Sequence, residues 1–213
     1  AIPLMGFDNV MPSCQVLKTM FRNVKDLNST PKTFMVVSPD EGAMHRNMYY
    51  ASVLGVDLGM FYKRRDYSRI INGRNPIVAH EYLGNSVEGK DVFISDDIIS
   101  SGDSMLDIAY ELKKRKAKRI IAYATYPIFT NGLAKFDEAY ENGIIDYVLG
   151  TNLTYRTPDL LKREWFYEVD ISKYIAYLVV ALNHDISTSK VIDPHSKIDA
   201  LLAKYNVKGA LKN

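Results

Sequence analysis

The sequence predicts an α/β protein built on a doubly wound, mostly parallel sheet with flanking helices. Short apolar runs alternate along the chain with segments whose apolar residues recur at helical spacing, a pattern typical of parallel βαβ units. Charged residues follow three of these apolar runs, at Asp40, Lys63 and Asp96. Because ligands bind beyond the carboxyl ends of strands in such sheets, we expect these positions to meet at one edge of the sheet.

The predicted elements follow one another in a regular order. Apolar runs predict strands at 34–37, 57–62, 92–95, 120–124, 146–149 and 166–169. Periodicity predicts helices at 42–54, 133–140, 172–182 and near 198–202, and one that carries Met105, Ile108, Ala109 and Leu112 on one face. The polar segment 66–88 is expected to be a connecting loop, long enough to suggest a function. We assign residues 1–185 to one domain and 186–213 to a C-terminal extension.

The composition excludes several classes of function. The chain of 213 residues is 47% hydrophobic and 24% charged, as in an ordinary globular protein. Its net charge of +2 gives no support for a nucleic-acid or membrane partner. Cys14 is the only cysteine, so no disulfide framework exists, and the apolar runs are too short to span a membrane. We therefore expect a cytoplasmic protein.

The segment 93–105 carries the strongest chemical signal. An apolar strand runs into two carboxylates, Asp96 and Asp97, and then into a short polar loop and a helix. The loop consists of Ser100, Ser101, Gly102, Asp103 and Ser104. Amides and hydroxyls at a helix N-terminus can bind a phosphate dianion, while the carboxylates can accept hydrogen bonds from sugar hydroxyls. This order predicts a phosphoribosyl site.

A structural explanation of the same residues is the alternative. Ser104 fits the first position of a capping box, and Gly102 could simply permit a turn. Neither role accounts for Asp96 and Asp97, because adjacent acids at the end of an apolar strand repel each other unless something binds them.

Two further motifs follow earlier strands. In the segment 38–46, Gly42 opens a predicted helix whose amides can meet a diphosphate, Arg46 lies one turn further, and Asp40 could be a Mg²⁺ ligand. The alternative makes Asp40 a helix cap and Arg46 a solvated surface residue. The run 63–65, Lys-Arg-Arg, could equally be a solvated charge run, but its place before a long loop favours a lid that brings charge onto transferring phosphates.

Taken together, the three motifs resemble those of the second half of the ribose-phosphate pyrophosphokinases, whose fold is that of the type I phosphoribosyltransferases. The resemblance is strongest over residues 34–151. It implies transfer of the diphosphoryl group of MgATP to ribose 5-phosphate, giving 5-phosphoribosyl 1-diphosphate and AMP for nucleotide biosynthesis. It also implies a homo-oligomer and a Mg²⁺ cofactor.

The resemblance assigns a role to each motif residue. Asp96 and Asp97 would hold the ribose hydroxyls, and Ser100, Ser101, Gly102, Asp103 and Ser104 the 5-phosphate. Asp40 would bind Mg²⁺, and Gly42 and Arg46 the diphosphate. Lys63 and Arg65 would act on the ATP phosphates as the catalytic cations.

The chain also departs from the family pattern. Ser100 stands where the family usually has Asp, Asp103 where it has a small residue, and Ala43 where it has a second glycine. The adenine-binding motifs of the family's first half are absent, and residues 1–9 resemble the start of the second half, so we expect one half of a longer two-domain enzyme. A base phosphoribosyltransferase and a non-catalytic, ligand-binding regulatory subunit remain the alternatives.

Overall fold

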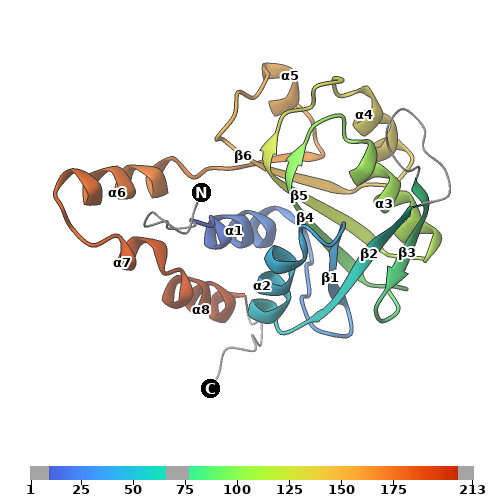
Figure 1. The fold of residues 1–213 in the computed structure, drawn as a ribbon, viewed down its shortest axis with the longest axis horizontal. Coiled ribbons are helices and arrows are strands. Elements are labelled where there is room, and N and C mark those ends of the chain that lie inside the picture. Colours follow the sequence, from blue (N-terminus) through green and yellow to red (C-terminus); the bar gives the residue numbers. More distant parts are fainter. Residues whose placement is uncertain (1–9, 66–76, 206–213) are drawn as a thin grey trace.

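The computed structural model describes residues 10–65 and 77–205, and its centre is a seven-stranded sheet (Figure 1). The strands are β1 Phe34–Ser38, β2 Asp57–Arg65, β3 Ile77–Leu83, β4 Asp91–Ile99, β5 Arg119–Pro127, β6 Tyr147–Thr151 and β7 Phe166–Val169. They are ordered β3-β2-β1-β4-β5-β6-β7, and every neighbouring pair is parallel except β2 and β3. The predicted fold class is confirmed.

Helices cover both faces of this sheet. They are α1 Ser13–Asn23, α2 Met44–Leu54, α3 Asp103–Lys114, α4 Ala134–Glu141, α5 Pro158–Leu161, α6 Ser172–Asn183, α7 Ser189–Ile192 and α8 His195–Lys204. One apolar cluster joins the sheet to α3 and α4, and a second joins its other face to α1, α2 and α8. In β1, Met35 and Val37 belong to the first cluster and Phe34 and Val36 to the second, so the strand is buried on both sides.

The strand β4 is longer than its apolar run. Pairing with β5 continues past the apolar residues, through Asp96 opposite Ala124 to Ile99 opposite Pro127. Asp96 and Asp97 therefore lie within the strand and not after it, because ladder hydrogen bonds outweigh the low strand propensity of acidic residues. The prediction that this strand ends at residue 95 was wrong.

The segment 66–88 is likewise not a single loop. Residues 77–83 form β3, which pairs antiparallel with the end of β2, and residues 66–76 lie outside the described part of the chain. The backbone of Lys63 and Arg65 belongs to β2, opposite His80 and Ile77 of β3. The apolar pattern did not indicate β3, which lies at the edge of the sheet beside β2.

Two helices at the chain's extremities pack against each other. The helix α1, which was not predicted, buries Val16, Leu17 and Met20 on one face, a spacing that was readable in the sequence. The predicted helix near 198–202 is confirmed as α8, whose Ile198 and Leu202 are buried in the same cluster as α1. The division of the chain at residue 185 stays a prediction. Within residues 10–65 and 77–205, no helix is long and apolar enough to cross a membrane.

Candidate phosphoribosyl site

The carboxyl ends of β1, β4 and β5 surround a pocket of about 330 Å³. Three of the predicted site residues line it, namely Gly42, Arg46 and Asp97. The remaining lining residues were not predicted, and they are Val10, Met11, Pro12, His45, Tyr50, Tyr123, Thr125 and Tyr126. Residues that follow β1 and an acid near the end of β4 therefore do meet at one sheet edge, as the topology requires.

A buried asparagine in α2 fixes the turn that precedes that helix. The Asn47 amide nitrogen donates to Ser38 Oγ at 3.3 Å, to the Ala43 carbonyl at 2.9 Å and to the Ser95 carbonyl at 2.8 Å. Its amide oxygen accepts from the Ser95 backbone N–H at 3.1 Å, and the whole residue is 0% exposed. Asn47 thus ties the end of β1 and the start of α2 to the residue before the acid pair.

The turn itself is held by short-range hydrogen bonds. Ser38 Oγ donates to the Asp40 carbonyl at 2.7 Å, and Asp40 Oδ1 accepts from the Ala43 N–H at 3.1 Å. Asp40 therefore closes the turn before α2, close to the structural alternative considered from the sequence. Gly42 does not open the helix as predicted, since α2 begins at Met44, two residues later.

The acid pair lies in a partly desolvated setting. Asp96 is one quarter exposed, and its Oδ1 lies 3.9 Å from Arg46 Nη1 and accepts the Asp97 backbone N–H at 2.8 Å. Burial raises the pKa of Asp96 to about 6, and the nearby charges of Asp97 and Asp40 act in the same direction against the hydrogen bond from Asp97. Three carboxylates therefore converge here with mutual repulsion, which a cation or a set of hydroxyl donors would relieve.

Arg46 has an unsatisfied donor at the same place. Its Nη1 is buried and has no hydrogen-bond partner among the described residues, because Asp96 at 3.9 Å is beyond hydrogen-bonding distance. The side chain is 26% exposed and lines the pocket. A buried guanidinium N–H without an acceptor is costly, so this atom is suited to an anionic oxygen of a ligand.

The polar loop between β4 and α3 is tightly formed. Gly102 has a φ of 83°, and a Cβ at this position would collide with the ring of Phe136. Phe136 is fully buried and packs on Phe129 and Trp165, with ring centroids 5.0 and 5.6 Å away. The loop therefore rests directly on an aromatic cluster, and only glycine can occupy this position without displacing it.

The first two residues of α3, Asp103 and Ser104, are exposed, and the helix has no side-chain cap at its N-cap position. The N-cap is Gly102 and supplies no side-chain cap, while Ser101 Oγ accepts the Asp103 N–H at 3.4 Å. The alternative in which Ser104 caps this helix is wrong, since Ser104 is the second residue of α3 and is exposed. The helix start is thus left with amides available to an anion.

Asp103, the carboxylate of this loop that departs from the family pattern, forms an ion pair with a lysine. Asp103 is exposed, and its Oδ1 accepts a hydrogen bond from Lys135 Nζ at the start of α4. That hydrogen bond lowers the pKa of Asp103. The lysine thereby offsets the negative charge that departs from the family pattern.

The segment that follows β5 forms hydrogen bonds with the loop between β4 and α3. The Ile99 carbonyl accepts the N–H groups of Ile128 and Phe129, each at 3.0 Å, and the Ser100 carbonyl accepts that of Thr130 at 3.0 Å. The hydroxyls of Ser100 and Thr130 lie 3.3 Å apart. Residues 128–130 were not predicted as part of the site, and only tertiary contact reveals them.

The residues predicted as catalytic cations and as the metal ligand are described only in part. Lys63 and Arg65 belong by their backbone to β2, beside β1, and their side chains lie outside the described part of the structure. Within that part, no three His, Cys, Asp or Glu side chains form a group that could hold a metal ion. A Mg²⁺ ion at Asp40 would therefore need oxygens from a bound substrate.

The fold and the site edge define an α/β protein of the type I phosphoribosyltransferase fold. The chain belongs to the phosphoribosyl transferase domain family, whose pattern it matches over residues 10–146. It is 29% identical over 188 residues to a ribose-phosphate pyrophosphokinase of Vibrio cholerae, covering 87% of this chain and 54% of that protein. A second such enzyme, from Shewanella oneidensis, is 31% identical over 183 residues, with 85% and 53% covered.

A solved structure supports the same fold. The crystal structure of phosphoribosylpyrophosphate synthetase from Mycobacterium smegmatis has a TM-score of 0.63 and 24% identity, covering 81% of this chain and 51% of that chain. The family match and the two relatives together confirm the resemblance to the ribose-phosphate pyrophosphokinases. The chain spans about half the length of these relatives, and they favour neither the base phosphoribosyltransferase nor the regulatory subunit.

Proposed function

We propose that this chain supplies the ribose-5-phosphate half of a ribose-phosphate pyrophosphokinase site. The reaction transfers the diphosphoryl group of ATP to the 1-hydroxyl of ribose 5-phosphate and releases AMP. The observation that carries the proposal is the spacing on β4 and α3, where an acid pair lies just before a glycine-hinged helix start. A sugar diol and a phosphate at the two ends of one small molecule match these two groups.

In this proposal each end of the sugar phosphate has its own partners. The amides of the first turn of α3, with the hydroxyls of Ser101 and Ser104, hold the 5-phosphate, and Asp97 and ionised Asp96 accept hydrogen bonds from the ribose hydroxyls. Arg46 offers its unpartnered Nη1 to the transferring diphosphate. Positioning and charge neutralisation are what phosphoryl-type transfer demands of a protein.

The acids at this edge do not by themselves form a metal site within the described residues, so Mg²⁺ would also need oxygens from a bound substrate. The charge of Asp40 is near enough to raise the pKa of Asp96, so these carboxylates share one region of negative potential. Asp40 would hold the ion together with substrate oxygens, and the ion would neutralise phosphate charge when bound. Lys63 and Arg65 would act on the ATP phosphates, which follows from the resemblance of their motif.

Two assays on the full chain test the proposal separately. Calorimetry with ribose 5-phosphate should show saturable binding that Ser104→Ala weakens a few-fold and Ser104→Glu abolishes, because the glutamate places a carboxylate where the phosphate sits. Release of AMP from MgATP should then depend on ribose 5-phosphate. Equal affinities of the two Ser104 variants would overturn the phosphate assignment, and binding without any AMP release would leave the chain as a binding half only.

A further inference from the structure

A second and larger pocket lies away from the candidate phosphoribosyl site. Its volume is about 640 Å³, and it is enclosed by α1, the end of β7, the first turns of α6 and one residue of α8. It shares no lining residue with the pocket at the ends of β1, β4 and β5. Figure 1 shows that α6 and α7 extend beyond the sheet before the chain returns to α1 through α8. The volume is in the range of small-molecule sites.

The walls of this pocket are rich in unpaired positive charge. Lys18 and Arg22 lie one turn apart on α1, Lys173 comes from α6 and Lys197 from α8. None of these four cations forms an ion pair with a carboxylate in the described part of the chain. Four clustered cations repel one another, so an anion would be bound with favourable energy.

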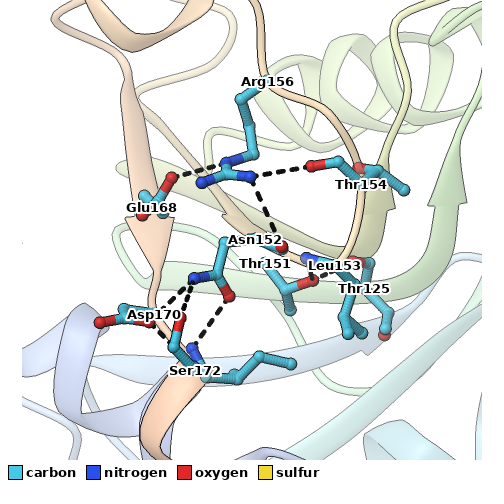
Figure 2. Close-up of polar contacts among 10 residues, drawn as sticks. Thr125, Thr151, Asn152, Leu153, Thr154, Arg156, Glu168, Asp170 and Ser172 are labelled. Atoms are coloured by element: carbon cyan, nitrogen blue, oxygen red, sulfur yellow. Dashed lines mark hydrogen bonds and ion pairs between the residues drawn. The ribbon is translucent and has the colours of Figure 1, made fainter. Parts of the chain in front are cut away.

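The two acids on the same walls are already engaged elsewhere. Figure 2 shows Glu168 bonded to Arg156, with 2.6 Å between Oε2 and Nε. It also shows Asp170 Oδ1 accepting the Asn152 amide at 2.8 Å and the Ser172 backbone N–H at 2.9 Å. These contacts leave the pocket with a net positive potential.

Three tyrosines give the pocket an aromatic component. Tyr167, Tyr174 and Tyr177 line it, and Lys173 Nζ lies 5.7 Å from the ring centroid of Tyr177. Tyr174 is only 8% exposed, yet its hydroxyl is buried without a hydrogen-bond partner among the described residues. Burial raises the pKa of Tyr174, so the hydroxyl remains a donor that lacks an acceptor. An orphaned donor of this kind costs free energy until a ligand satisfies it.

We propose that this pocket binds a nucleotide, with its phosphate on the lysines and Arg22 and its base against the tyrosine rings. Arginine and lysine are suited to phosphate oxygens, and aromatic rings stack on any planar base. The Tyr174 hydroxyl would donate to one of the ligand's acceptors. Inorganic phosphate alone would make no contact with the tyrosine rings. An uncharged aromatic ligand would not neutralise the four cations. This proposal does not depend on the reaction proposed above, because the pocket shares no lining residue with the candidate phosphoribosyl site.

The sole cysteine makes the test specific to this pocket. Cys14 lines the pocket, is partly exposed, and is the only thiol in the chain. The rate of its alkylation by iodoacetamide therefore reports occupancy of this site alone. AMP should slow alkylation at least fivefold and saturably, whereas adenosine and ribose 5-phosphate at the same concentration and ionic strength should slow it less than twofold.

Matched variants separate this pocket from the phosphoribosyl site. The double variant Lys18→Ala/Arg22→Ala should lose the protection by AMP, and Tyr174→Phe should need about tenfold more AMP because one buried hydrogen bond is lost. Asp97→Asn should keep full protection. Absence of protection by AMP, equal protection by ribose 5-phosphate, or loss of protection in Asp97→Asn would each overturn the proposal, and near-native circular dichroism of every variant guards against unfolding.

Discussion

The turn before α2 is held by one buried side chain, whereas the loop before α3 is held by backbone contacts and by the absence of a side chain. Asn47 makes four hydrogen bonds across β1, β4 and α2. The other loop has Gly102 against Phe136 and carbonyl groups that accept from residues 128–130. Removing side-chain atoms should therefore destabilise the turn before α2, which is the first end of the site. Adding side-chain atoms should destabilise the loop before α3, which is the second end.

The largest effect is expected from adding one methyl group at the second end. Gly102→Ala combines a positive φ with a collision against a buried ring, and should lower the free energy of unfolding by about 3 kcal/mol. Urea denaturation measures this loss. Combining it with Phe136→Leu should recover part of the loss by making room. A change below about 0.5 kcal/mol for Gly102→Ala would show that the loop does not rest on the ring.

Removing the buried amide at the first end should be nearly as costly. Asn47→Ala leaves the Ser95 N–H and C=O groups without their partner, which should cost about 2–3 kcal/mol in the free energy of unfolding. Ser38→Ala is the matched control, because it removes only the 3.3 Å contact to Asn47 and the bond to the Asp40 carbonyl. Thermal unfolding compares the two. Equal losses in both variants would contradict the central role of Asn47.

Asp96 should link stability to pH. Its pKa is about 6 in the folded protein against 3.8 when unfolded, so the folded state retains a proton between these values that the unfolded state has lost. The free energy of unfolding should therefore fall as pH rises from about 4 to 6 and stay lower above it. Asp96→Asn should remove this fall and stabilise the ligand-free protein at pH 7.5 by on the order of 1 kcal/mol, after allowance for solvent screening.

The control for this prediction is a pH at which Asp96 is neutral in both the folded and the unfolded state. At about pH 3, below both pKa values, the stability difference between the wild-type protein and Asp96→Asn should be smallest, because the side chain is uncharged in both proteins. If the stability difference between them is the same at about pH 3 and about pH 7.5, the raised pKa is refuted.

The smallest effect concerns the surface pair at the second end. Lys135→Ala should leave stability unchanged, because both partners are about half exposed. It should weaken ribose 5-phosphate binding roughly threefold at low salt, because the Asp103 carboxylate is no longer offset. The double variant Asp103→Ala/Lys135→Ala should restore the wild-type affinity in calorimetry. If neither variant changes the affinity for ribose 5-phosphate, the Asp103 carboxylate does not interact electrostatically with the bound phosphate.

The two ends also differ in how much of them could be predicted. The alternation of strands and helices, and the acids and serines between Phe93 and Met105, are local patterns and were sufficient for the fold class and the candidate motifs. Asn47 carries no such signal, because nothing in a helix sequence reveals that one polar residue faces a neighbouring strand. The pairing of Lys135 with Asp103 and the extension of β4 arise from contacts between segments distant in the chain, which a single sequence does not contain.

The most direct test of the account is a calorimetric titration of this chain with ribose 5-phosphate in the presence of Mg²⁺. The wild-type chain and Lys63→Ala should bind with similar affinity, because Lys63 is assigned to the ATP phosphates, while Asp97→Asn should bind at least tenfold more weakly. Equal losses in the two variants, or no binding by the wild-type chain, would contradict the assignment of Asp97 and the α3 loop to the sugar phosphate.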